Sequence, residues 1–157
     1  MNARRLGRVL VSAAIAGSVA LMSPATATAA TGCSQADSQA ASQKYLDALV
    51  DGDAAWAIPL HPFVLRMENG LPTSVSALDL KLQLYLHVQY SVFTSIENVV
   101  WTWQPDGRAD VINAHYDIPV GLGGLSLASS TVDEDFTLTS DCRIKRIDAT
   151  FTIDPPA

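Results

Sequence analysis

The sequence predicts one small α+β domain whose N-terminal helices pack on one face of an antiparallel sheet. Two observations predict this class. Apolar residues in the first half of the chain follow a helical spacing, and the second half is rich in β-branched and aromatic residues between turn-forming residues. An apolar segment with a positively charged start precedes both regions and is typical of exported proteins.

Residues 1–30 are interpreted as a cleavable signal peptide. A positively charged region comes first, with Arg4, Arg5 and Arg8. Residues 9–22 follow as an apolar stretch, which is shorter than the roughly 20 residues that a membrane-spanning helix needs. The small residues at 25–30 suit a signal peptidase. We therefore predict a secreted, extracytoplasmic protein with no membrane span.

Removal of the signal peptide changes the charge of the chain. Taking 30 residues from 157 leaves 127, which suits one domain. Three of the ten basic residues and none of the sixteen acidic ones are lost, so the net charge changes from −6 to −9. Such a surface repels phosphate backbones, which argues against nucleic acid as a partner. No P-loop or dinucleotide motif is present, and His61 and His87 have no spaced partners, so neither a cofactor nor a metal is predicted.

The two cysteines, Cys33 and Cys142, are predicted to form a disulfide, because exported proteins meet an oxidising environment. The bond would close a loop of about 110 residues and contribute roughly 4–5 kcal/mol by the chain-entropy model. The alternative is a lipid anchor on Cys33, since residues 30–33 resemble a lipobox. That alternative leaves Cys142 as an unpaired thiol.

Helices are predicted in the first part of the mature chain. After a flexible lead-in over residues 31–36, one apolar stripe predicts a helix over residues 37–50, which Asp37 can cap. A short helix over residues 54–58 follows, with Asp53 as its cap.

The next two segments are a strand and an ambiguous stretch. Residues 63–68 predict a strand that the Asn-Gly pair at 69–70 closes. Within residues 74–88 the apolar residues alternate as in a strand, but the abundance of Leu, Lys and Gln favours a helix. On propensity we predict a helix there, capped by Ser74 or Ser76.

The rest of the chain is predicted to be β-structure. The predicted strands are residues 92–96, 98–104, 108–120, 130–139 and 143–153. A turn at 105–107 and a glycine-rich loop at 121–127 connect three of them, and residues 154–157 form a tail.

Four stretches of the chain resemble the nuclear transport factor 2-like superfamily and, within it, secreted bacterial members of the SnoaL-like group. They are residues 45–53, 63–70, 106–118 and 136–151. The resemblance covers a domain over residues 37–153. It implies a cone-shaped α+β fold in which a curved antiparallel sheet and the helices enclose a pocket. The superfamily contains isomerases, cyclases and hydrolases as well as binding proteins, so the resemblance alone does not define an activity.

The strand over residues 108–120 carries the main catalytic candidates, His115 and Asp117. They resemble the place where limonene-epoxide-hydrolase-like members carry an arginine and an aspartate two residues apart. Residues two apart share a face of a strand, and a His–Asp pair can orient a base. However, histidine replaces arginine, and that group's second aspartate falls near Ala149. Strand parity favours another interpretation, in which Tyr116 lines the pocket and His115 faces solvent.

A second candidate pair is Arg66 and Glu68. If they face inward, they can bind a ligand or each other. The favoured interpretation is that they are solvated, with the core occupied by their neighbours Phe63, Leu65 and Met67.

The aromatic residues are candidates for the pocket wall or for the core, and core packing is the default. The candidates for ligand binding are Arg66 and the aromatic residues Trp56, Tyr90, Trp101 and Tyr116. Residues 133–135 form an acidic run that is interpreted as a solvated face, because calcium needs a ligating loop.

Three hypotheses for function follow. The leading one is a secreted domain whose apolar pocket binds a small hydrophobic ligand or a protein partner, without strong evidence of catalysis. The second is an isomerase or hydratase-type enzyme that uses His115, Asp117 and Glu68. The third is a structural module that forms a homodimer through Trp101 and Trp103.

Overall fold

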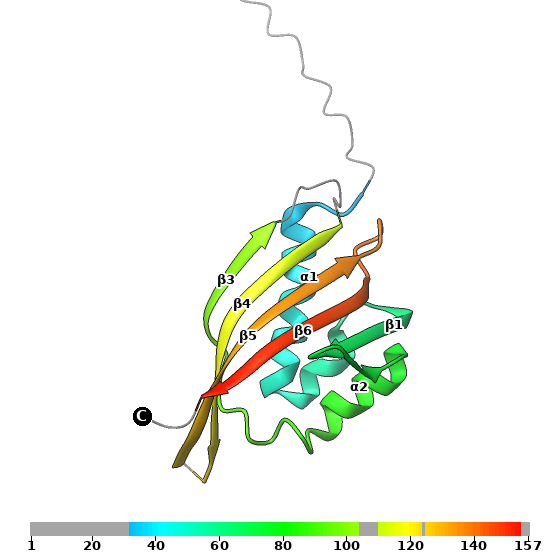
Figure 1. Ribbon diagram of the computed structural model, residues 1–157. Coiled ribbons are helices and arrows are strands. Elements are labelled where there is room, and N and C mark those ends of the chain that lie inside the picture. The colour runs from blue at the N-terminus through cyan, green and yellow to red at the C-terminus, as the bar shows by residue number, and fades with distance from the viewer. Residues whose placement is uncertain (1–31, 104–109, 124, 155–157) are drawn as a thin grey trace, which may run out of the picture.

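The computed structural model describes residues 32–103, 110–123 and 125–154. In these residues helices pack on one face of a curved six-stranded sheet, which is the predicted fold class (Figure 1). Three predicted features lie outside the described residues. They are the signal peptide, residues 30 and 31 of the segment that resembles a lipobox, and the turn at 105–107.

The first helix, α1 (Gln35–Val50), begins earlier than predicted because its cap is a serine. The Ser34 hydroxyl accepts a hydrogen bond from the Asp37 backbone N–H, so the predicted lead-in over residues 31–36 already contains helix. The predicted apolar stripe is buried, and it includes Ala41, Tyr45, Leu46 and Leu49. A 3-10 helix, η1 (Gly52–Ala57), follows with Asp51 instead of Asp53 as its cap.

The ambiguous stretch at 74–88 contains a helix, α2 (Ala77–Leu86), as propensity predicts. Ser76 caps it by accepting from the Asp79 backbone N–H. Leu80 and Leu84 are fully buried, and they are one helical turn apart. The other leucines of the alternating pattern lie on the exposed side, namely Leu78, Leu82 and Leu86. The alternation therefore did not indicate a strand.

The six strands pair in the order β2-β1-β6-β5-β4-β3. Their bounds are β1 (Leu60–Glu68), β2 (Leu71–Ser74), β3 (Glu97–Trp103), β4 (Val111–Leu122), β5 (Leu125–Leu138) and β6 (Ile144–Asp154). All neighbours are antiparallel except β1 and β6, which are parallel. The sheet is thus mixed, and not wholly antiparallel as predicted, because β1 joins the sheet beside the last strand.

Several strand boundaries differ from the prediction. The strand β1 begins at Leu60, and β2 was not predicted. Residues 92–96 form a loop with a single bridge between Phe93 and Val120. The segment at 121–127 was predicted to be a loop, but β4 and β5 continue through it as a hairpin that extends past the other strands (Figure 1).

The predicted disulfide between Cys33 and Cys142 is present, with the two Cα atoms 5.0 Å apart. It joins the residue before the cap of α1 to the turn between β5 and β6. A disulfide is consistent with an extracytoplasmic location. In the described part of the chain, every helix is too short or too polar to cross a membrane.

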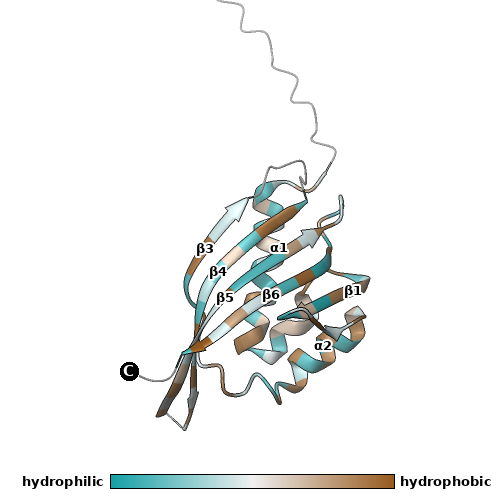
Figure 2. Ribbon diagram, viewed as in Figure 1, coloured by the Kyte–Doolittle hydropathy of each residue, from teal (hydrophilic) through white to brown (hydrophobic). Residues whose placement is uncertain are grey.

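The two faces of the sheet differ in composition. Along β4 and β6 hydrophilic and hydrophobic residues alternate (Figure 2). The inner face, which α1 covers, carries Ile112, Ala114, Tyr116 and Ile118 of β4, and all four are buried. Tyr45 of α1 packs edge-on against Phe136 of β5, with 5.5 Å between the ring centroids. The outer face carries the intervening polar residues of the same strands.

Candidate ligand-binding site

A cavity of about 150 Å³ lies on the inner face of the sheet. Its walls come from α1, from the loop before β3 and from strands β1, β4, β5 and β6. Most of the lining is apolar, for example Leu49, Phe93, Ile118, Val132, Phe151 and Ile153. The polar lining residues are Arg66, Glu68, Tyr116, Ser130 and Glu134. An apolar cavity with a few polar groups is the usual form of a small-molecule site.

Strand register explains why space remains between the polar groups. Glu134 of β5 pairs with Ala149 of β6, and Ala149 pairs with Glu68 of β1. On its other side Glu134 pairs with Ala114 of β4. The two glutamates therefore stand in one row of the sheet with an alanine between them. A larger residue at position 149 would occupy the space between the two carboxyl groups.

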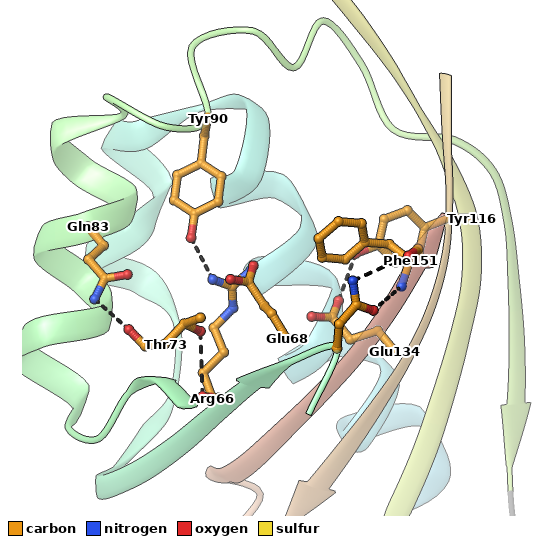
Figure 3. A network of polar contacts seen from close by, with 9 residues as sticks. Arg66, Glu68, Thr73, Gln83, Tyr90, Tyr116, Glu134 and Phe151 are labelled. Atoms are coloured by element: carbon orange, nitrogen blue, oxygen red, sulfur yellow. Dashed lines mark hydrogen bonds and ion pairs between the residues drawn. The ribbon is translucent and has the colours of Figure 1, made fainter. Parts of the chain in front are cut away.

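Arg66 is buried at the base of the cavity, and only 3% of it is exposed. Its Nη1 donates to the Tyr90 hydroxyl at 2.6 Å, and its Nη2 lies 2.7 Å from Glu68 Oε1. Figure 3 shows Tyr90 above the guanidinium and Glu68 beside it. The guanidinium also lies over the rings of Tyr45 and Tyr90, at 5.7 and 5.6 Å from their centroids.

The acidic group of the site is Glu134, which is fully buried on β5. The Tyr116 hydroxyl donates to its Oε2 at 2.8 Å. Burial raises the pKa of Glu134 to about 7, although Arg66 and the hydrogen bond from Tyr116 lower it. The Tyr45 hydroxyl is close enough to lower this pKa further, but no regular hydrogen bond joins it to Glu134.

The tyrosines and the arginine of the site keep their usual protons. Burial raises the pKa of Tyr45, Tyr90 and Tyr116, so all three remain neutral hydroxyls. Burial by itself lowers the pKa of Arg66, but its neighbours raise it above the ordinary value. The site thus contains one permanent cation and one carboxyl group that titrates near neutral pH.

Two buried polar atoms of this cluster have no hydrogen-bond partner among the described residues. They are Arg66 Nε and the Tyr45 hydroxyl. A buried polar atom without a partner is unfavourable, and in native proteins water or a ligand commonly completes it. The base of the cavity therefore has unused hydrogen-bonding capacity.

Asn69 fixes the edge of the site where β1 ends. Its side chain accepts from the Phe151 backbone N–H at 3.0 Å and donates to the Phe151 carbonyl at 3.4 Å. Its own N–H donates to the Ala149 carbonyl at 2.8 Å. Asn69 has a positive φ of 48°, a conformation that asparagine tolerates better than most residues. These bonds hold Glu68 and Phe151 in place on the cavity wall.

The structure places the predicted catalytic pair His115 and Asp117 on the outer face, away from the cavity. His115 Nδ1 lies 2.9 Å from Asp133 Oδ1, and both side chains are about half exposed. Asp117 accepts from Asn98 at 2.8 Å and from Thr131 at 3.0 Å, and these bonds lower its pKa. The enzyme hypothesis therefore loses these two residues, because Tyr116 between them is the one that lines the cavity.

The other candidates divide between the cavity and elsewhere. Tyr116 lines the cavity. Tyr90 does not line it but accepts a hydrogen bond from Arg66, which does. Trp56 is half exposed beside Tyr85 and does not line the cavity. Trp101 is partly buried against Phe136 of the core, and Trp103 packs on the same core.

Two interpretations of charged residues were wrong. Arg66 and Glu68 face inward, since they share the parity of the buried Val64, whereas Phe63 is 80% exposed. Glu134 was assigned to a solvated acidic run, yet it lies on the inner face with Val132 and Phe136. Strand parity with these two apolar neighbours was the signal that could have found it.

No metal site is apparent in the described residues, where His, Cys, Asp and Glu side chains form no group of three or more that could hold an ion. The cation that faces the carboxyl groups of the cavity is instead the guanidinium of Arg66.

Comparisons with known proteins agree on the fold. Residues 32–151 match the family described as "Domain of unknown function (DUF8021)". No curated protein sequence matches the chain significantly. The chain is similar in structure to SalBIII, an epoxide hydrolase/cyclase-like enzyme in pyran ring formation in polyether salinomycin. The TM-score is 0.61 at 13% identity, over 77% of this chain and 97% of that one.

Two further solved structures are similar. A SnoaL-like protein from Burkholderia thailandensis E264 has a TM-score of 0.55 at 16% identity, over 76% of this chain and 98% of that one. A nuclear transport factor 2-like protein from Cytophaga hutchinsonii ATCC 33406 has a TM-score of 0.54 at 13% identity, over 74% and 97%. At such identities the likeness shows the fold alone. The predicted resemblance in fold to nuclear transport factor 2-like and SnoaL-like proteins is confirmed.

Proposed function

This chain belongs to the DUF8021 family, and we propose that it is an exported protein whose cavity binds a small, mostly apolar ligand. One observation carries the proposal. The cavity on the inner face has apolar walls and a base of polar groups that retain unused hydrogen-bonding capacity. Apolar walls supply affinity, and a few fixed polar groups supply orientation.

The ligand is expected to lie with its apolar part against Phe93, Ile118 and Phe151 and its polar end toward Arg66 and Glu134. Burying its apolar surface stabilises the complex by roughly 25 cal/mol for each Å² removed from water. Contacts within the protein hold Arg66 and Glu134 in position, so little side-chain ordering is needed on binding.

Binding can be tested with the uncharged fluorescent ketone 6-propionyl-2-(dimethylamino)naphthalene, whose emission shifts to shorter wavelength in apolar surroundings. We expect saturable binding to the mature protein. The variant Ala149→Leu should abolish it, because the larger side chain fills the space between Glu134 and Glu68. Circular dichroism checks that the variant is folded.

The matched control is Thr150→Leu, which places the same side chain on the next residue of β6, on the outer face. It should bind the probe as the unmodified protein does. Equal probe binding by the Ala149→Leu variant, or no saturable binding by the unmodified protein, contradicts the proposal.

Export is part of the proposal and has its own test. The disulfide between Cys33 and Cys142 supports an extracytoplasmic location. We expect the protein from the culture medium to begin near residue 31 and to have an intact mass two hydrogens below the reduced chain. A diacylglyceryl adduct on Cys33 would contradict this and favour surface attachment.

A second candidate function is an isomerase or hydratase-type enzyme in which Glu134 moves the proton. The observation that favours it is a buried carboxyl group in the cavity whose pKa of about 7 suits a general acid or base. Incubation with an apolar ketone in heavy water should then give deuterium beside the carbonyl, and Glu134→Gln should prevent it. If exchange is no faster than in buffer, the result contradicts the enzyme function, and ligand binding is the function that remains.

A further inference from the structure

We propose that the polar end of the ligand is an uncharged oxygen acceptor, bound by the protonated carboxyl group of Glu134. Glu134 is then the residue that decides the ligand class. Ketones, esters and ethers are accepted, whereas carboxylates are excluded. This inference rests on the proposed binding function and specifies the chemistry of the same cavity.

The first argument is the balance of charge in the cavity. Arg66, Glu68 and Glu134 are its charged or acidic lining residues. Arg66 has committed one Nη atom to Glu68 and the other to Tyr90. Glu134 has no ion-pair partner of its own, and its hydrogen bond comes from the neutral hydroxyl of Tyr116. A second anion in this place would add a negative charge without a matching cation.

The groups that face Glu134 come from every element around it. Tyr45 lies on α1, Arg66 and Glu68 lie on β1, and Tyr116 lies on β4. The neighbouring position on β6 is Ala149, which carries no charge. Among these groups the one cation is already paired with Glu68. The surroundings therefore favour the neutral, protonated form of Glu134, and its pKa of about 7 agrees with this.

The second argument is the kind of hydrogen bond that the cavity still lacks. Tyr116 occupies Oε2 of Glu134, so a protonated Oε1 is able to donate. Arg66 Nε is a buried donor without a partner among the described residues, and an arginine nitrogen cannot accept. Both groups require an acceptor. A carbonyl or ether oxygen satisfies that requirement without adding charge.

An ammonium group is the opposite case. It would pair with an ionised Glu134 but would bring a second cation close to Arg66, and it has no lone pair to offer Arg66 Nε. Carboxylate and ammonium ligands therefore each fail one requirement of the site, the carboxylate by its charge and the ammonium by its lack of an acceptor.

The test compares three probes with the same apolar chain length: 2-nonanone, nonanoate and nonylammonium. Dissociation constants are measured by calorimetry on the mature, disulfide-bonded protein at about pH 5.5 and about pH 8.5. We expect 2-nonanone to bind at least about tenfold more tightly than either ion at the lower pH. Its affinity should fall about 30-fold at the higher pH, because roughly 3% of Glu134 remains protonated there.

The variant Glu134→Gln keeps a donor that does not titrate, so it should bind 2-nonanone equally at both pH values. The matched control is Asp133→Asn, the adjacent residue on the outer face, which should keep the pH dependence of the unmodified protein. Equal affinity for 2-nonanone and nonanoate, tighter binding of nonylammonium, or pH-independent binding of 2-nonanone by the unmodified protein overturns this inference alone. If none of the three probes binds, the proposed function fails as well.

Discussion

Two arginine–acid pairs of the same spacing lie on neighbouring strands but on opposite faces of the sheet. Arg66 and Glu68 are on β1 and face the cavity, and Arg146 and Asp148 are on β6 and face outward. The side chain of Arg66 is 4% exposed, whereas that of Arg146 is 45% exposed. Both pairs are in hydrogen-bond contact. The difference is their surroundings, because solvent screens the outer pair and aromatic rings enclose the inner one.

The comparison shows that burial, and not residue type, decides the chemistry of a charged residue in this sheet. Glu134 and Asp133 are adjacent acids on β5. Burial raises the pKa of Glu134 to about 7, whereas Asp133 lies near His115 in solvent. A one-residue step along the strand moves a side chain from solvent to the cavity.

The largest effect is expected from loss of the disulfide, which attaches the start of α1, the helix that covers the inner face, to the end of β5. Replacing both cysteines in Cys33→Ser/Cys142→Ser removes the bond between the start of α1 and the end of β5. We expect the free energy of unfolding to fall by about 4–5 kcal/mol, since the denatured chain is no longer constrained. Urea unfolding of oxidised, reduced and variant protein measures this. A variant as stable as the oxidised protein would contradict the expectation.

The next test compares the two arginines directly. Arg66→Leu leaves Glu68 without its cation and Tyr90 without its donor, so we expect a loss of about 3 kcal/mol in the free energy of unfolding. Arg146→Leu on the outer face should cost about 1 kcal/mol or less. Urea titrations at neutral pH measure both. Similar losses would mean that burial does not distinguish the pairs.

The third test measures how the free energy of unfolding depends on the protonation of Glu134, which lies on the inner face of the sheet. Because the pKa of Glu134 is raised from 4.5 to about 7, the unfolded chain releases this proton first as pH rises. The stability contributed by the protonated group is present below about pH 4.5 and is lost by about pH 7, at a cost of about 3 kcal/mol. Glu134→Gln should therefore be more stable than the unmodified protein at about pH 8, with little difference at about pH 4. Asp133→Asn should show no such gain, and thermal melts at both pH values decide.

The smallest effect is expected on the outer face. Removal of the His115–Asp133 contact by His115→Gln should change the free energy of unfolding by less than about 1 kcal/mol, because both side chains are about half exposed. Added salt should reduce even this difference. The variant should bind the fluorescent probe normally. Loss of probe binding by this variant would show that His115 contributes to the ligand-binding site.

Local patterns in the sequence predicted the helices, most strands and the disulfide. The register between strands was not predicted, and the base of the cavity depends on it. Tyr116 could be placed by parity within β4. The row formed by Glu134, Ala149 and Glu68 requires the pairing of β5 with β6 and the parallel pairing of β6 with β1. The pairing of β1 with β6 joins residues far apart in the chain, so no local pattern encodes it.

Glu134 was missed as a site residue for a different reason. Composition favours solvent for an acidic run, and this general tendency outweighed the parity that Glu134 shares with Val132 and Phe136. Arg66 was misplaced in the same way, although Val64 shares its face of β1. In both cases hydrogen-bond or ion-pair partners make burial tolerable, namely Tyr90 and Glu68 for Arg66 and Tyr116 for Glu134.

The side chain of Asn69 has a consequence for the behaviour of this sheet toward other molecules. The last ladder position of β1 on β6 is Glu68, opposite Ala149, so the backbone groups of Phe151 on that side would form an open edge. The asparagine amide saturates both of them. An open edge is a template for strands of other chains and promotes aggregation. A single side chain thus protects this stretch of β6, where Phe151 lines the cavity, against intermolecular pairing.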